Sequence, residues 1–370
     1  MTNQKSSPKT WIIREYTEKD RSGVFNLRKA VYGEPFRENE WNWKFINKYA
    51  GRSSRIFVAE SDGLIVGVRP IICSPLKSRK QYVISGLDVD MMVHPDFRNL
   101  GIFTGLVRES IKTVQSEGVD IILSFPNENS YPGLKRSKNI KWQHVNTVPL
   151  LAMPLNFDKL SKRLTKNWLL QRIGSLTGKL IFSLIRVFGV RRRDNTNDIT
   201  INRVRTFDQR FDGLWQTASD QFNLAIRRDS NYLQWRYGEK PDVEYAIFSA
   251  EKDNKLAGYI VLKISQELLN LNLGLIVDML TVQDDQVIKA LLAKAVAYFK
   301  EKKADAIGCI MLPYTGYYKA LKRQGFMAIP NRFSPKQFYF MVYTAQNRIS
   351  DEMAGNAGNW FITFGDIDIV

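Results

Sequence analysis

The stretch HPDFRNLGIFTG, residues 94–105, lies where a predicted strand gives way to a predicted helix. Residues 81–93 before it have the apolar pattern of a long strand, which Pro95 closes. After it, apolar residues recur at helical spacing at Ile102, Leu106, Val107, Ile111 and Val114. They predict a helix over 102–117, which Gly118 ends.

The flanking segments predict further strands. Residues 119–125 form the next apolar run, so strand, helix and strand follow one another. Upstream, 55–60 and 64–73 have strand-like patterns on either side of the turn at 61–63, which predicts a hairpin. This order of elements predicts an α/β fold (α+β, with a mixed sheet).

A glycine-containing turn that leads into a helix suits a phosphate group. The first N–H groups of a helix have no partner within it, and the helix dipole adds positive potential there. Gly101 has no Cβ to block a close approach, and Arg98 adds a cation. The loop is neither GxxxxGK[ST] nor GxGxxG. It therefore predicts a phosphate or pyrophosphate ligand held by a loop of another type.

The second half of the chain repeats the plan of the first. Four blocks recur in the same order: WNWKF (41–45) as LQWRY (233–237), FVAESDGLIVG (57–67) as IFSAEKDNKLAG (247–258), VDMMV (89–93) as VDML (277–280), and VDIILSFPNENSYPGLKR (119–136) as ADAIGCIMLPYTGYYKALKR (304–323). A period this long indicates two domains. Where the first copy has HPDFRNLGIFTG, the second has VQDDQVIKALLA, without the glycine and with acidic residues in place of the arginine. Only the first copy therefore carries the predicted phosphate loop.

Length and charge agree with two domains and an anionic partner. The chain has 370 residues and a formal charge of +17, and a usual domain has ~100 to 200 residues. Such a charge favours phosphate groups, nucleic acid or anionic lipid as partners. Cys73 and Cys309 form no CxxC pair, and His94 and His144 lie in no ligand pattern. We therefore predict a cytoplasmic protein without a disulfide framework and without a metal.

The segment VDMMVHPDFRNLGIFTGLV resembles the acyl-CoA signature of the GCN5-related N-acetyltransferases (the GNAT family), whose Arg/Gln-x-x-Gly-x-Gly/Ala loop cradles the pyrophosphate of coenzyme A. The resemblance covers most of residues 11–153, and the second copy looks like a degenerate relative of the same fold. It implies two tandem acetyltransferase-like domains and acetyl-CoA or another acyl-CoA as co-substrate. The loop residues that it implies as cofactor contacts are Arg98, Asn99, Leu100, Gly101, Ile102, Phe103 and Thr104.

The same resemblance implies contacts with the pantetheine arm. Backbone groups near Met92 and Val93 would pair with it, and Asn127 or Asn129 would contact it from the neighbouring strand. The sequence departs from the family pattern twice. Phe103 replaces a small residue, and Lys135 stands where many members carry the tyrosine that protonates the thiolate.

Acyl transfer to an amine needs a base for the amine and an acid for the thiolate. Asp88 and Asp90 share one face of the predicted strand, so either could be the base, or each could be paired by a cation. Glu128 is a third candidate with the same alternative. Tyr131 could be the acid, or a packing residue, because the second copy has Tyr317 at the matching place.

We predict these boundaries: a disordered lead-in over 1–10, an acyl-CoA-binding domain over 11–154, a basic linker helix over 155–198, a degenerate domain over 199–345 and a tail over 346–370. In the linker, 168–190 has its cations on one stripe and its leucines and isoleucines on the opposite face, which predicts an amphipathic helix. Two interpretations stay open. The helix either packs on the two cores, or residues 168–193 bind an anionic membrane surface at the inner face.

The leading functional hypothesis is an acyl-CoA-dependent N-acyltransferase. Its acceptor would be an amine on a small molecule or saccharide, such as an amino sugar or a cell-envelope precursor. One alternative is an aminoacyl-tRNA-dependent peptidyltransferase of the peptidoglycan cross-bridge type, which pairs two such domains and suits the basic charge, although the intact R-x-x-G loop argues against it. The other is a non-catalytic, membrane-peripheral binding protein. We expect no DNA partner, and the sequence sets neither the acyl chain length nor the oligomeric state.

Overall fold

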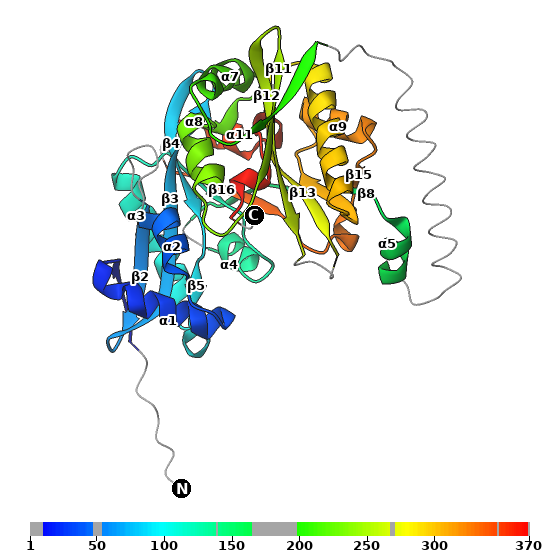
Figure 1. Ribbon diagram of the computed structural model, residues 1–370. Coiled ribbons are helices and arrows are strands. Elements are labelled where there is room, and N and C mark those ends of the chain that lie inside the picture. Colours follow the sequence, from blue (N-terminus) through cyan, green and yellow to red (C-terminus); the bar gives the residue numbers. More distant parts are fainter. Residues whose placement is uncertain are drawn as a thin grey trace. The chain divides into compact units, whose positions relative to one another are not determined.

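The computed structural model describes residues 10–46, 54–137, 140–164, 198–266, 271–345 and 348–368. The chain divides into two compact units (Figure 1). Unit 1 comprises residues 1–146, 239–241 and 339–356, and unit 2 comprises residues 147–238, 242–338 and 357–370. Most of the predicted linker helix over 155–198, including the amphipathic stretch at 168–190 and the membrane-binding range 168–193, lies outside the described residues, as does most of the predicted lead-in.

Unit 1 is built on a mixed sheet with the order β1-β2-β3-β4-β6-β16-β7, and β5 also pairs with β3. The strands are β1 (Ile12–Glu15), β2 (Arg55–Ser61), β3 (Leu64–Ser78), β4 (Gln81–Asp88), β5 (Met92–Val93), β6 (Ile121–Ser124), β7 (Gln143–Thr147) and β16 (Tyr339–Thr344). Among β1, β2, β3, β4, β6 and β16, neighbours pair antiparallel except β4 and β6, which run parallel on either side of the α3 crossover. The predicted α/β fold with a mixed sheet is confirmed.

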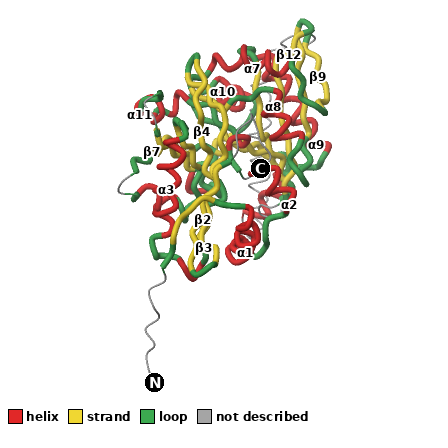
Figure 2. Tube along the Cα trace, turned by 90° about the vertical axis from the view of Figure 1, so that its left-hand side faces the viewer, coloured by secondary structure: helices red, strands yellow, loops and turns green. Residues whose placement is uncertain are grey.

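Helices cover this sheet on both sides. The helices are α1 (Arg21–Tyr32), α2 (Glu38–Trp41), α3 (Ile102–Ser116), α4 (Tyr131–Lys135) and α11 (Asp351–Gly355), with a π-helical turn at Asn42–Ile46. In Figure 2, α1 and α3 lie on opposite sides of β2 and β3. The apolar stripe of α3, with Leu106, Val107 and Ile111, packs into one core with Phe57, Ile71 and Met341.

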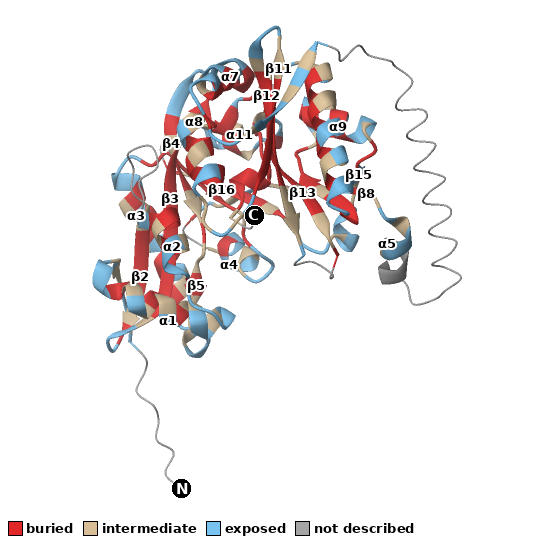
Figure 3. Cartoon of the chain, in the orientation of Figure 1, coloured by how far each residue is buried: buried red, intermediate tan, exposed pale blue. Residues whose placement is uncertain are grey.

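Unit 2 has a sheet of the same plan, with the order β9-β11-β12-β13-β14-β8-β15. Its strands are β8 (Leu150–Pro154), β9 (Ile199–Val204), β11 (Ala246–Lys252), β12 (Lys255–Ser265), β13 (Leu273–Thr281), β14 (Ala306–Ile310) and β15 (Met327–Ala328). The longer helices are α5 (Phe157–Leu164), α7 (Arg210–Ala218), α9 (Asp285–Glu301) and α10 (Gly316–Arg323), and β10 (Leu224–Ile226) and α8 (Ser230–Leu233) lead to a second π-helical turn at Gln234–Gly238. Figure 3 shows β12 and β13 buried along much of their length.

The strand that follows each copy in sequence joins the sheet of the other copy. β16, which follows the second copy in sequence, pairs with β6 of unit 1, whereas β8, which follows the first copy, pairs with β14 of unit 2. The structure thus divides the chain differently from the predicted ranges 11–154 and 199–345. An apolar pattern identifies a strand, but the sheet that it joins depends on hydrogen bonds between residues far apart in sequence.

The predicted tail over 346–370 also divides between the units. Its first part, including α11, belongs to unit 1, and the part from Ala357 belongs to the core of unit 2, where Trp360, Phe361 and Phe364 are buried. Arg228, which is fully buried, donates to Asp366 at 2.6 Å and to Asp278 at 3.1 Å, and so ties this segment to β13. The segment is a structural element of unit 2.

Candidate functional site

The loop between β5 and α3 has the geometry that the sequence predicts for a phosphate site. Arg98, Asn99 and Leu100 are exposed, and Gly101 is the N-cap of α3. Asn99 and Gly101 have positive φ angles of 63° and 82°, a left-handed conformation that glycine adopts without strain. No side chain caps α3, and its first turn contains no acidic residue. The N–H groups of this turn can therefore receive an anion.

The strand before this loop bends away from its parallel neighbour. β4 pairs with β6 as far as Asp88 opposite Ser124, whereas β5 pairs with β3. Between the pairs Val68–Met92 and Ile71–Asp88, β3 has two intervening residues and the facing strand has three, so the facing strand contains one extra residue. This is a β-bulge, with Asp90 at a φ of 45°. The continuous strand predicted over 81–93 is therefore two strands.

The bulge leaves the peptide groups of Val93 free on one side. His94 donates its backbone N–H to Val66 at 2.8 Å, and the next pair in the ladder is Gly67 opposite Val93. Because bonded and non-bonded pairs alternate in an antiparallel ladder, the N–H and C=O of Val93 point away from β3. They face the side on which β6 has ended. Of the two predicted pantetheine contacts, Val93 thus offers free backbone groups, while Met92 pairs with β3 and its side chain is buried.

Asp88 lies in a buried ion pair. Arg69, fully buried, donates Nε to Asp88 at 2.9 Å and also donates to the Val107 carbonyl at 3.2 Å. Ser124 donates its hydroxyl to the other carboxylate oxygen at 3.0 Å. Both carboxylate oxygens accept hydrogen bonds. Of the two predicted alternatives, base or cation-paired carboxylate, the structure shows Asp88 as the cation-paired carboxylate.

Asp90 is also paired with cations. Lys44, which is 5% exposed, approaches one oxygen at 2.5 Å, and Arg28 approaches the other at 3.8 Å. The recurring blocks gave no signal for this pair, because the matching residues of the second copy, Arg236 and Asp278, have other partners. The pairing of Asp90 is a sufficient structural reason for its presence.

The loop after β6 holds the remaining polar candidates. Asn127 accepts with Oδ1 from the backbone N–H groups of Asn129 and Ser130, both at 3.0 Å, so its side chain folds the turn into α4. Glu128 and Asn129 are exposed. Glu128 has no ion pair among the described residues, in contrast to Asp88 and Asp90.

Tyr131 packs among aromatic side chains at the start of α4. Its ring stacks on Tyr339 with a centroid distance of 4.1 Å and contacts the ring edge of His144 at 5.6 Å. Burial, with the charge of Lys135, lowers the pKa of His144 below 6.5. Tyr339 had no local sequence signal, since it comes from the far end of the chain on the exchanged strand β16. Tyr131 thus has a packing role, and its predicted role as an acid is untested.

Phe103, the large residue at a loop position where the family pattern has a small one, packs its ring against Gly133 of α4. A Cβ added to Gly133 would lie 2.9 Å from the Phe103 ring, so the ring occupies space that a side chain at Gly133 would need. Thr104 and Ile102 complete the first turn of α3, and Ile102 is buried in the core. The larger residue is accommodated by a smaller one on the facing helix.

In unit 2, side chains occupy the helix N-terminus and the strand-end peptide groups that correspond to the open ones of unit 1. At α9, the Asp284 side chain caps the helix by accepting from Gln286 N–H at 2.8 Å, and Lys252 pairs with the same carboxylate at 2.6 Å. Thr281 stands opposite Gly258 as Val93 stands opposite Gly67. Its N–H donates to the Tyr317 hydroxyl at 2.9 Å, and that hydroxyl donates to its C=O at 3.1 Å.

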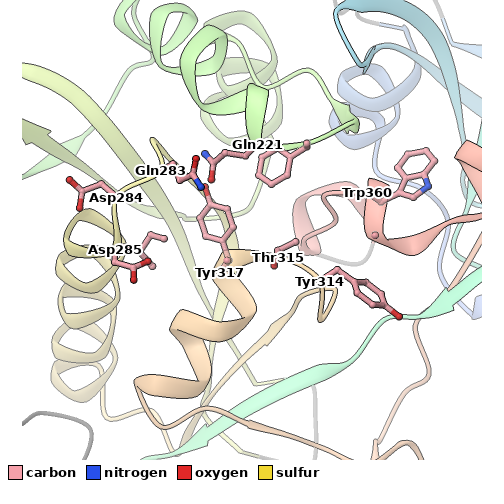
Figure 4. A pocket seen from close by; sticks show the side chains of 12 residues that line it. Gln221, Gln283, Asp284, Asp285, Tyr314, Thr315, Tyr317 and Trp360 are labelled. Carbon is pink, nitrogen blue, oxygen red and sulfur yellow. The ribbon is translucent and has the colours of Figure 1, made fainter.

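A cavity of about 300 Å³ remains between the starts of α9 and α10 in unit 2 (Figure 4). Gln221, Gln283 and Tyr317 line it, together with the carboxylates of Asp284 and Asp285. Asp285 pairs with Arg323 at 3.0 Å. The carboxylates and the capped helix make this cavity unsuitable for a phosphate group.

Among the described residues, no group of three or more His, Cys, Asp and Glu side chains lies together as metal ligands would. None of the described helices is both long and apolar enough to cross a bilayer.

Comparison with known proteins agrees with the site. Residues 12–137 match the family model of the acetyltransferase (GNAT) domain. A GCN5-related N-acetyltransferase from Anabaena variabilis ATCC 29413 superposes with a TM-score of 0.63 at 10% identity, over 91% of this chain and 73% of that one. A probable N-acyltransferase from Enterococcus faecalis V583 gives 0.61 at 11% identity, over 91% and 73% of the two chains.

A third structure resembles the chain over a larger share of its own length. The N-myristoyltransferase of Saccharomyces cerevisiae with bound myristoyl-CoA gives a TM-score of 0.55 at 14% identity, over 92% of this chain and 85% of that one. At such identities these likenesses concern the fold. No curated protein sequence matches the chain.

The fold and the family match define the class of this protein, which is an acyltransferase. Residues 12–137 match the acetyltransferase (GNAT) domain family, as the loop sequence predicts. That the second copy is a degenerate member of the same family stays a prediction.

Proposed function

We propose that unit 1 binds acyl-CoA and transfers its acyl group to an amine. The observation that carries the proposal is the pair of open backbone sites, the N–H and C=O of Val93 beside the uncapped N-terminus of α3. The first suits an amide of the pantetheine arm, and the second, with Arg98, suits the pyrophosphate. The myristoyl-CoA bound to the similar yeast enzyme supports an acyl-CoA ligand.

The chemistry assigns tasks to the residues near the end of β6. The attacking amine must be neutral, so a base removes its proton before or during attack on the thioester. We propose Glu128 for this task, because Asp88 and Asp90 are each held by cations. The departing thiolate takes a proton, and Tyr131 is the proposed donor. The exposed turn before α4 would face the acceptor.

The acceptor is proposed only as an amine-bearing small molecule. A saccharide or cell-envelope amine, the peptidyltransferase reaction and a membrane surface rest on the overall charge and on 168–193, and the latter lies outside the described residues. We propose that unit 2 binds no acyl-CoA, because Asp284 and Tyr317 occupy the matching positions.

Calorimetry with acetyl-CoA, and coenzyme A release with an amine panel, test the proposal. Arg98→Glu and Gly101→Asp put negative charge beside the pyrophosphate, and each is expected to weaken binding about 100-fold. Thermal unfolding should stay the same in Arg98→Glu, whereas Gly101→Asp should lower the unfolding temperature slightly, because position 101 has a φ of 82°. Matched controls are Arg108→Glu on the exposed face of α3 and Gln286→Asp in unit 2. If the wild-type protein binds no acyl-CoA, or the controls lose as much affinity, the proposal is wrong.

A further inference from the structure

Trp11, which belongs to none of the sequence motifs, bonds to the proposed phosphate loop at 98–101. Its indole Nε1 donates a hydrogen bond to the Leu100 carbonyl at 3.0 Å. The backbone on both sides of Trp11 is held by hydrogen bonds. The adjacent Thr10 carbonyl accepts from the buried Ser61 hydroxyl at 2.6 Å, and the following residue, Ile12, begins the pairing of β1 with β2.

Two glycines make room for the indole ring. A Cβ added to Gly105 would lie 2.9 Å from Cη2 of Trp11, closer than real Cβ atoms approach a ring. A Cβ added to Gly101 would lie 3.7 Å from Cζ2, an ordinary contact distance. The ring therefore lies against Gly105 and reaches the glycine that caps α3. Its position requires a residue without a side chain at 105.

The hydrogen bond orients one peptide group. The structure contains no cis peptide bond among its described residues, and in a trans peptide the C=O and N–H point in opposite directions. Because the Leu100 C=O points at the indole, the Gly101 N–H points away from it. Positive φ angles at Asn99 and Gly101, with Leu100 between them, are typical of loops whose successive N–H groups surround an anion.

We propose that Trp11 is a positioning residue of the acyl-CoA site, which fixes the Leu100–Gly101 peptide in the orientation that presents the Gly101 N–H to the pyrophosphate. The inference rests on the proposed function of unit 1. Without the indole N–H, the exposed peptide can rotate to bond water through either group, and binding must then select one orientation. Trp11 touches neither the thioester nor the amine, so its effect is confined to the phosphate end of the cofactor.

Trp11→Phe removes the donor and keeps an aromatic ring. We expect its affinity for acetyl-CoA, measured by calorimetry, to fall about fivefold, the usual effect of one net hydrogen bond. Its kcat/KM with S-acetylpantetheine, which lacks the pyrophosphate, should equal that of the wild type. The matched control is Trp142→Phe, since Trp142 packs against the same core but its Nε1 has no partner among the described residues.

Gly105→Ala provides a second variant if Trp11→Phe folds poorly, because the added methyl group displaces the indole, together with the Ile13 side chain at 2.7 Å, while residue 11 remains a tryptophan. It should show the same selective loss on acetyl-CoA. Equal losses on acetyl-CoA and S-acetylpantetheine would indicate general destabilisation and overturn the inference, as would an unchanged affinity in Trp11→Phe. A wild-type protein that binds no acetyl-CoA would instead overturn the proposed function.

Discussion

The open end of β5 in unit 1 and the matching end of β13 in unit 2 have the same backbone frame and different chemistry. In both, a glycine of the central hairpin stands opposite a residue whose peptide groups point away from the hairpin, Val93 in one case and Thr281 in the other. In unit 2 the Tyr317 hydroxyl pairs with both groups. The difference teaches that one tyrosine hydroxyl can satisfy peptide groups whose counterparts in unit 1 point away from the hairpin without such a partner in the described residues.

The helix that follows shows the same contrast. Gly101 leaves the start of α3 uncapped, whereas Asp284 caps α9 and brings a negative charge to it. Capping stabilises a helix by ~1 kcal/mol and removes the anion site at the same time. Helix α3 of unit 1 therefore lacks the side-chain cap that α9 of unit 2 has. A missing cap is expected where a ligand accepts hydrogen bonds from the first N–H groups of the helix.

Among variants of the two strand ends, the largest loss of cofactor affinity is expected from Val93→Pro. Proline has no N–H, and its ring would occupy the place where the pantetheine arm is proposed to bond. Since the Val93 N–H takes no part in the ladder with β3, the fold should tolerate the change. We expect acetyl-CoA affinity to fall about tenfold, measured by calorimetry.

Thr281→Pro is the counterpart in unit 2, where the N–H donates to Tyr317. It should lower the midpoint of urea unfolding and leave acetyl-CoA affinity as it is. The comparison breaks down if the two proline variants lose cofactor affinity to the same extent.

A smaller effect is expected from Tyr317→Phe. The change removes the hydroxyl that satisfies the Thr281 peptide groups, which are buried, so unfolding should become easier by about 1–3 kcal/mol. Urea unfolding checks the stability, and calorimetry checks that acetyl-CoA affinity is unchanged. A rise in acetyl-CoA binding stoichiometry would show that Tyr317 alone keeps the cofactor out, and that the aspartates of α9 do not.

Local patterns predicted much of this frame. The predicted helix over 102–117 is observed as Ile102–Ser116, and the hairpin predicted at 55–60 and 64–73 is observed as Arg55–Ser61 and Leu64–Ser78. The loop at 98–101 was assigned correctly to a helix N-terminus because its glycine and its apolar spacing are local signals. The predicted family is confirmed by the match over 12–137.

The remaining features depend on residues distant in sequence. The exchange of β8 and β16 has no local signal, because each strand has the same apolar pattern in either sheet. The cation partners of Asp88 and Asp90 come from β3 and the π-helical turn, and Trp11 is 89 positions from the carbonyl that it bonds. The alternation of side chains along a strand predicts on which face of the sheet a carboxylate lies. Only tertiary packing determines which cation pairs with it.

The smallest expected effect concerns Lys135, at the position where the family resemblance leads us to expect a tyrosine. Burial and the charge of Lys135 both disfavour the protonated imidazole of His144, and they lower its pKa below 6.5. Because the folded-state pKa is lower than the unfolded one, stability is lost as pH falls through this range. Lys135→Ala removes the second cause, so the pKa of His144 should rise toward 6.5 and less stability should be lost at pH 5. An NMR titration measures this, with His144→Gln to assign the resonance and the His94 resonance as an internal control. A pKa of His144 that stays the same or falls in Lys135→Ala would show that burial alone sets it, and that Lys135 does not act on the aromatic cluster at the start of α4.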